Sequence, residues 1–175
     1  MNFGVFGVPV LCCGPGFSGG WIACSSDEGS MNDMAAETPK RARAILDFWF
    51  GELDADGMPA PEVMRRWFES DASFDAEVRE RFGPDLERVD ALGTWEESPA
   101  GALALVVLTD QLARNIHRGS AAAFARDGLA RAVARRAIAA GHERALRPIE
   151  RVFLYLPLEH AEDLDLQEEC VRRFR

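Results

Sequence analysis

Five polar side chains on one helix-length segment could bind a charged ligand. They follow the apolar run Leu103–Leu108. At about 100° per residue they share one sector of a helix, which apolar residues occupy one turn earlier. Charge at the edge of a core is costly unless it is paired, so the group is either a structural network or a binding site. Its members are Asp110, Gln111, Arg114, Asn115 and Arg118.

Both interpretations of this group stay open. Asp110 and Arg114 stand at i and i+4 with the acid first, which favours a salt bridge within the helix. This salt bridge, together with hydrogen bonds from Gln111 and Asn115 to neighbouring helices, would explain the whole group as a structural network. However, Arg114 and Arg118 lie one turn apart and repel each other unless an anion lies between them. Two guanidinium groups suit a carboxylate or a phosphate, and Asn115 could orient it.

A second candidate group surrounds His160, with Glu159, Glu162 and Asp163 close in sequence. On a helix His160 and Asp163 share a face, and a carboxylate beside an imidazole fixes its tautomer and raises its pKa, as a general base requires. A buried histidine that is merely hydrogen-bonded needs the same partner. We predict that Arg114, Asn115 and Arg118 converge with His160 on one cavity, where the basic and acidic groups face each other.

Several other chemistries are disfavoured. The chain has three histidines and no paired cysteine or histidine spacing, so we expect no metal site and no cofactor. It has no Gly-x-Ser-x-Gly motif, and Cys170 occupies an amphipathic segment as an ordinary core residue would. The sequence thus predicts a binding domain for an anionic small molecule or an acidic peptide end. The alternatives are a hydrolase or lyase with His160 and Asp163 as base, and a scaffold without a ligand.

The elements that must position these residues are helices. Cap and proline pairs at Thr38-Pro39 and Ser98-Pro99, a cap at Ser120, and stops at Gly51 and Gly141 divide the chain into short helical segments. Gly83-Pro84 and Pro157 should interrupt two of them. No alternating strand pattern is present, which predicts an all-α antiparallel stack. Four residues of the central helix should be inaccessible: Leu103, Leu105, Val107 and Leu108.

Composition and charge limit the partners. The 175 residues carry a net charge of −9, and 47% of them are hydrophobic, as in an ordinary globular protein. Residues 47–97 hold 15 acids against 5 bases, whereas residues 114–151 hold 9 bases against 3 acids. This asymmetry fits helical layers of complementary charge, or an anion pocket in the second half. Nucleic acid is a poor partner for so acidic a chain, and no apolar run is long enough for a membrane span.

The first 34 residues differ from the rest. They contain no Lys or Arg, seven of the fifteen glycines and three of the four cysteines. We expect a disordered tail or a start codon placed too early, followed by one helical domain over residues 35–175. Cys170 is then the only cysteine of that domain, which excludes an internal disulfide and favours the cytoplasm.

Five ordered blocks resemble a bacterial family of unknown function, DUF924. They are ILDFWFG at 45–51, the Trp67-Phe68 to Phe74-Asp75 run, LALVVLTDQLARNIHRG at 103–119, AAFARDGLA at 122–130 and FLYLPLEHAEDLDLQE at 153–168. The resemblance implies a tetratricopeptide-like superhelix and no established activity. It also implies a further C-terminal helical segment that nothing here matches. If that segment is missing, Leu166, Cys170, Val171 and Phe174 should be exposed and the chain should self-associate.

Overall fold

Helices make up nearly all the regular structure of residues 38–174, the part of the chain that the computed structural model describes. The α-helices are α1 (Lys40–Phe50), α2 (Pro61–Phe68), α3 (Ala72–Glu87), α4 (Pro99–Val106), α5 (Ala113–Ile116), α6 (Asp127–Ala139), α7 (Pro148–Glu159) and α8 (Leu164–Arg173). Short 3₁₀ helices join them: η1 (Val89–Ala91), η2 (Gly93–Glu97), η4 (Ala121–Phe124) and η5 (His142–Ala145). The expected tail, residues 1–34, lies outside the described residues.

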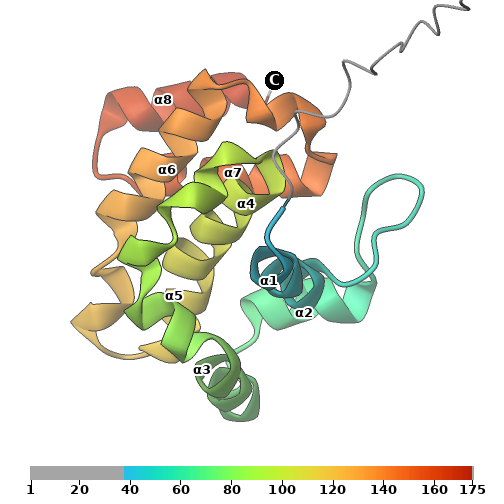
Figure 1. Cartoon of the computed structure of the whole chain (residues 1–175), viewed down its shortest axis with the longest axis vertical. Helices are drawn as coiled ribbons and strands as arrows, with labels where there is room; N and C mark the ends of the chain where they lie inside the picture. Colours follow the sequence, from blue (N-terminus) through green and yellow to red (C-terminus); the bar gives the residue numbers. More distant parts are fainter. Residues whose placement is uncertain (1–37, 175) are drawn as a thin grey trace, which may run out of the picture. The chain divides into compact units, whose positions relative to one another are not determined.

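Pairing of β type is confined, within these residues, to one isolated bridge between Leu53 and Pro59. The predicted all-α fold is therefore confirmed. The order of helices places α4 among α1, α6 and α7, against all of which it packs (Figure 1). A helix surrounded in this way must be apolar on every side.

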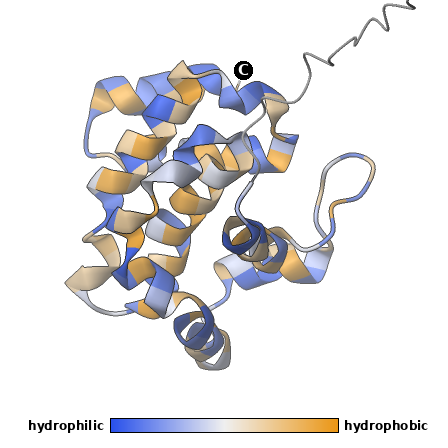
Figure 2. Cartoon of the chain, in the orientation of Figure 1, coloured by the Kyte–Doolittle hydropathy of each residue, from blue (hydrophilic) through white to orange (hydrophobic). Residues whose placement is uncertain are grey.

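The central segment has that character. Leu103, Val107 and Leu108 are fully buried and Leu105 is 3% exposed, so the burial prediction is confirmed. Helices at the surface, such as α3 and α8, instead alternate between hydrophobic and hydrophilic residues (Figure 2). On α8 Cys170 is buried, Leu166 is partly buried and Val171 is exposed, as is Phe174 directly after the helix. The expected exposure of this helix thus holds for two of its four named residues.

Some of the predicted helix ends are confirmed by the structure, and others are wrong. Ser98 caps α4, since its Oγ accepts a hydrogen bond from the Gly101 N–H at 3.1 Å, and Gly141 adopts the left-handed conformation after α6. Gly51 also has a positive φ, of 63°. The cap at Thr38 is wrong, because α1 begins at Lys40 with Pro39 as the residue before it. Ser120 precedes a 3₁₀ turn and forms no side-chain cap, and α6 starts only at Asp127.

Neither internal proline stops its helix. Helix α3 continues through Gly83-Pro84 to Glu87, and α7 continues through Pro157 to Glu159. Proline removes one hydrogen-bond donor and clashes with the preceding turn, a cost that tertiary packing can offset. Here the residues beyond each proline are buried: Asp85 and Leu86 in α3, and Leu158 in α7. Burial of these side chains favours one more turn of helix.

The aromatic residues of α1 form part of the core. Trp49, Trp67 and Phe153 pack on one another with ring centroids 4.6 to 6.0 Å apart. Trp67 also donates a hydrogen bond from Nε1 to the Trp49 carbonyl at 3.0 Å. These contacts fix α1 and α2 against α7, whereas Phe68 of α2 is exposed.

Candidate functional site

The segment between α4 and α5 is a π-helical turn, η3 (Val107–Leu112), in which Asp110 lies near the middle. Such turns carry i to i+5 hydrogen bonds and are frequently found at functional sites. The Thr109 hydroxyl donates to the Leu105 carbonyl at 2.6 Å and so satisfies one acceptor of the altered ladder. Asp110 is thereby held among core residues and is only 1% exposed.

A buried carboxylate needs hydrogen-bond donors and positive charge, and Asp110 has both. Gln111 Nε2 donates to Oδ2 at 2.6 Å, Arg114 Nη2 lies 3.2 Å from Oδ1, and His160 Nδ1 lies 2.9 Å from Oδ1. The helix pair predicted between Asp110 and Arg114 is therefore present. His160, the residue after α7, completes the cluster from a segment 50 residues away.

The tautomer of His160 follows from its neighbours. A carboxylate only accepts a hydrogen bond and a guanidinium only donates one. Nδ1 lies closer to Asp110 Oδ1 than to Arg114 Nη2, at 2.9 against 3.2 Å, so we assign its proton to the bond with Asp110. The hydrogen bond to Asp110 raises the pKa of His160 above its ordinary value, while burial and the charge of Arg114 oppose this rise. None of the described residues bonds Nε2.

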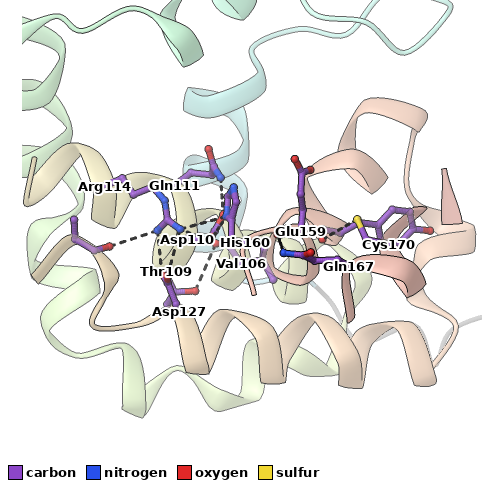
Figure 3. A network of polar contacts seen from close by, with 12 residues as sticks. Val106, Thr109, Asp110, Gln111, Arg114, Asp127, Glu159, His160, Gln167 and Cys170 are labelled. Atoms are coloured by element: carbon purple, nitrogen blue, oxygen red, sulfur yellow. Dashed lines mark hydrogen bonds and ion pairs between the residues drawn. The ribbon is translucent and has the colours of Figure 1, made fainter. Parts of the chain in front are cut away.

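Arg114 links this cluster to α6. Its Nη1 and Nη2 donate to Asp127 Oδ1 and Oδ2 at 2.9 and 3.4 Å, so one guanidinium contacts both Asp127 and Asp110 (Figure 3). Asp127 is the first residue of α6, where a carboxylate also interacts favourably with the helix dipole. The guanidinium carbon lies 5.2 Å from the centre of the Phe124 ring. Arg114 is therefore neutralised by two carboxylates and has one face against an aromatic ring.

A pocket of about 830 Å³ opens beside the cluster. Phe124 and Leu166 form its apolar lining. Its polar lining comes from α5, α6 and the loop between α7 and α8, and consists of Arg114, Asp127, Arg131, His160, Glu162 and Asp163. Pockets of 300 to 1,000 Å³ are typical of small-molecule sites.

The structure brings Arg114 and His160 together but places Asn115 and Arg118 elsewhere. Asn115 Nδ2 donates to Asp75 Oδ1 at 2.8 Å, and Arg118 donates to both oxygens of the same carboxylate. The guanidinium of Arg118 is the main reason why the pKa of Asp75 is lowered. The predicted convergence of all three with His160 is therefore wrong. Asn115 and Arg118 connect α5 to α3, and the repulsion between Arg114 and Arg118 is relieved by separate carboxylates.

The expected partner of His160 also differs. Asp163 is the cap of α8, where its Oδ1 accepts from the N–H groups of Asp165 and Leu166 at 3.0 and 3.3 Å. The carboxylate bonded to the imidazole is instead Asp110, because the chain ends α7 at Glu159 and places His160 against η3. Glu162 lines the pocket, as does Asp163, and it forms no ion pair among the described residues.

Sequence reasoning missed Asp127, Arg131 and Phe124. Arg131 lies one turn after Asp127 on α6 and is partly buried in the pocket wall, without a salt bridge among the described residues. The excess of bases over residues 114–151 was one signal. The spacing of Asp127 and Arg131, i and i+4 like Asp110 and Arg114, was another.

Over residues 38–174, no group of three or more His, Cys, Asp or Glu side chains could hold a metal ion. In that range there is also no helix with the length and apolar character required to cross a membrane. Cys170 is buried, and burial raises the pKa of its thiol, which keeps it in the unreactive protonated form.

Fold and site together define an all-α protein with a polar pocket built on an Asp–His–Arg cluster. The chain belongs to a family described as bacterial proteins of unknown function (DUF924), whose model matches residues 45–175. It is also similar to a solved structure of a protein of unknown function from Agrobacterium tumefaciens, with 38% sequence identity and a TM-score of 0.66. That match covers 77% of this chain and 72% of the other. A search of curated proteins gave no match.

The His160–Asp110 bond should make stability depend on pH. Because the pKa of His160 is raised by folding, its contribution is fully present below about pH 6.5, the unfolded value, and is lost as pH rises through the folded value. Urea unfolding from about pH 6 to pH 9 should show this decline. The decline should be smaller in His160→Gln but unchanged in His117→Gln. An equal decline in wild type and His160→Gln would contradict the assignment.

Proposed function

We propose that the pocket beside Asp110, Arg114 and His160 binds a small molecule through an anionic group. The observation that supports this most directly is Arg131, a partly buried cation in the pocket wall without a salt-bridge partner among the described residues. A charge in such a place is stabilised when a counter-charge arrives. The imidazole of His160, whose pKa is raised by the hydrogen bond to Asp110, adds positive charge on the same wall when it is protonated.

Arg114 has a supporting role in this proposal. Its guanidinium is engaged by Asp110 and Asp127, so it contributes less free charge than its position suggests. It fixes the position of both carboxylates and of the Phe124 ring beside the pocket. We therefore place the anion site at Arg131 and His160 in place of Arg114, Asn115 and Arg118, with Arg114 in contact with His160.

Binding of a simple anion tests this function. We expect 3-phenylpropionate or inorganic phosphate to shift amide resonances around Arg131, Phe124 and His160 in an NMR titration. Arg131→Met should weaken that binding about tenfold, because a charge-assisted hydrogen bond is lost. Arg135→Met is the matched control, since Arg135 is exposed one turn further along α6 and does not line the pocket. Equal loss in both variants, or no binding of either anion, would contradict the proposal.

One observation favours an enzyme as second candidate. Asp110 holds Nδ1 of His160, which leaves Nε2 without a partner among the described residues, the arrangement of a general base. In the neutral imidazole Nε2 could accept a proton from water or substrate. The test is whether a compound that binds is also converted, as followed by mass spectrometry. Conversion should cease in His160→Gln while binding is retained.

The location of the protein, its partners and its superhelical arrangement belong to the same proposal. A cytoplasmic location is supported by Cys170, which is a buried free thiol and the single cysteine of residues 38–174. Self-association and the absence of a nucleic-acid partner stay predictions from charge and from the exposed residues of α8. The tetratricopeptide-like superhelix stays an implication of the family resemblance.

A further inference from the structure

Two opposite charges in the pocket wall have no ion-pair partner among the described residues: Arg131 on α6 and Glu162 between α7 and α8. They line the same pocket but do not pair with each other. The other charges there are already engaged. Arg114 and Asp127 form a salt bridge, His160 bonds Asp110, and Asp163 caps α8. The pocket therefore offers one positive and one negative site that do not form an ion pair with each other.

Two apolar side chains line the pocket as well. Phe124 is 59% exposed, a large value for an aromatic residue, and Leu166 is partly buried. One face of the Phe124 ring is covered by Arg114, which holds the ring in place. An apolar group of a ligand that covered these side chains would remove hydrophobic surface from water.

We infer that the natural ligand is a short peptide with free termini and an apolar side chain. Its carboxylate would meet Arg131, its ammonium group would meet Glu162, and its side chain would cover Phe124. The size of the pocket, about 830 Å³, exceeds the need of a single amino acid and suits a compound of drug size. The inference rests on the proposed function, since the carboxylate would occupy the proposed anion site.

Capped dipeptides separate the two charges experimentally. The probes are alanyl-phenylalanine, its N-acetyl form, which lacks the ammonium group, and its C-terminal amide, which lacks the carboxylate. Binding of each to the full chain is measured by NMR titration. We expect each cap to weaken binding roughly five- to tenfold, the effect of one partly exposed charged contact. Free phenylalanine, whose charges are close together, should bind more weakly than the dipeptide.

Variants assign each terminus to its residue. In Glu162→Gln the dipeptide and its N-acetyl form should bind equally, and in Arg131→Met the dipeptide and its amide should bind equally. Glu168→Gln on α8 and Arg135→Met on α6 are matched controls, because both residues lie outside the pocket and should leave all preferences unchanged.

The outcomes distinguish the inference from the proposed function. If the N-acetyl form binds wild type as tightly as the dipeptide and Arg131→Met weakens both, the anion site stands and the peptide inference is overturned. If free phenylalanine binds better than the dipeptide, the ligand is a single amino acid and the inference is again overturned. If no peptide binds but 3-phenylpropionate does, only the inference fails. If neither binds, both fail.

Discussion

Replacing Arg114 by methionine is expected to lower the free energy of unfolding by about 3 kcal/mol or more, because it leaves a buried carboxylate without its cation. Asp110 is 1% exposed and would keep only Gln111 and His160 as partners. Asp127 would lose both of its hydrogen bonds from the guanidinium. The loss should be smaller at acidic pH, where protonated His160 still supplies positive charge to Asp110.

Two comparisons make this expectation specific, with urea unfolding as the measurement. Arg114→Lys keeps the charge but not the two-pronged contact with Asp127, so it should be destabilised by less than the methionine variant. Arg65→Met removes a pair with Glu69 in which both side chains are more than 60% exposed. It should change stability by at most about 0.5 kcal/mol. A loss below about 1 kcal/mol in Arg114→Met would show that the cluster contributes little to folding.

The sequence predicted the fold well because its signals are local and strong. The all-round apolar character of Leu103–Leu108 required a surrounded helix, and Ser98-Pro99 marked its start. At other helix ends, tertiary packing has more influence on where the helix stops than the local sequence does. Pro84 and Pro157 remain inside helices because the residues beyond them are buried. A periodic pattern cannot show how much a buried side chain offsets a lost hydrogen bond.

The candidate site could be predicted only in part, for a geometric reason. The sector assigned to Asp110, Arg114 and Arg118 assumed an α-helix throughout, whereas Val107–Leu112 is a π-helical turn with a different rotation per residue. Asp110 lies in the core, whereas Asn115 and Arg118, which follows the end of α5, contact Asp75 of α3. Asp75, their partner, lies 40 residues before Asn115. Spacing within one helix carries no information about such a distant partner.

The hydrogen-bond partner of His160 also lies far from it in the sequence. The neighbours of His160 in sequence, Glu159, Glu162 and Asp163, suggested a carboxylate partner, and the structure supplies one from 50 residues away. Arg114 does lie beside His160, as predicted, but its ion-pair partners are Asp110 and Asp127 and not Glu159, Glu162 or Asp163. Asp110 was expected to pair with Arg114 on its own helix, so the sequence did not identify it as the partner of His160 as well.

For the substitution Gly101→Ala in α4, intrinsic helix propensity and packing have opposite effects on the free energy of unfolding. Alanine is a better helix former than glycine by about 1 kcal/mol, so the sequence alone would favour Gly101→Ala. A Cβ at this position, however, would lie 2.1 Å from the Trp95 carbonyl oxygen and 2.8 Å from the Ser98 Oγ. The backbone of η2 and α4 would have to separate, and Ser98 would lose its capping hydrogen bond to the Gly101 N–H. We expect a loss of about 3 kcal/mol or more in unfolding free energy.

Gly128 provides the matched control in α6. It is exposed, and a Cβ there would meet nothing within 4 Å, so Gly128→Ala should gain about 0.5 to 1 kcal/mol from the lower entropy of the unfolded chain. Thermal and urea unfolding of both variants measure the contrast. If Gly101→Ala were also stabilised, α4 could move away from η2 at no cost. The apolar helix that precedes Asp110 would then be less rigidly fixed than a preformed pocket requires.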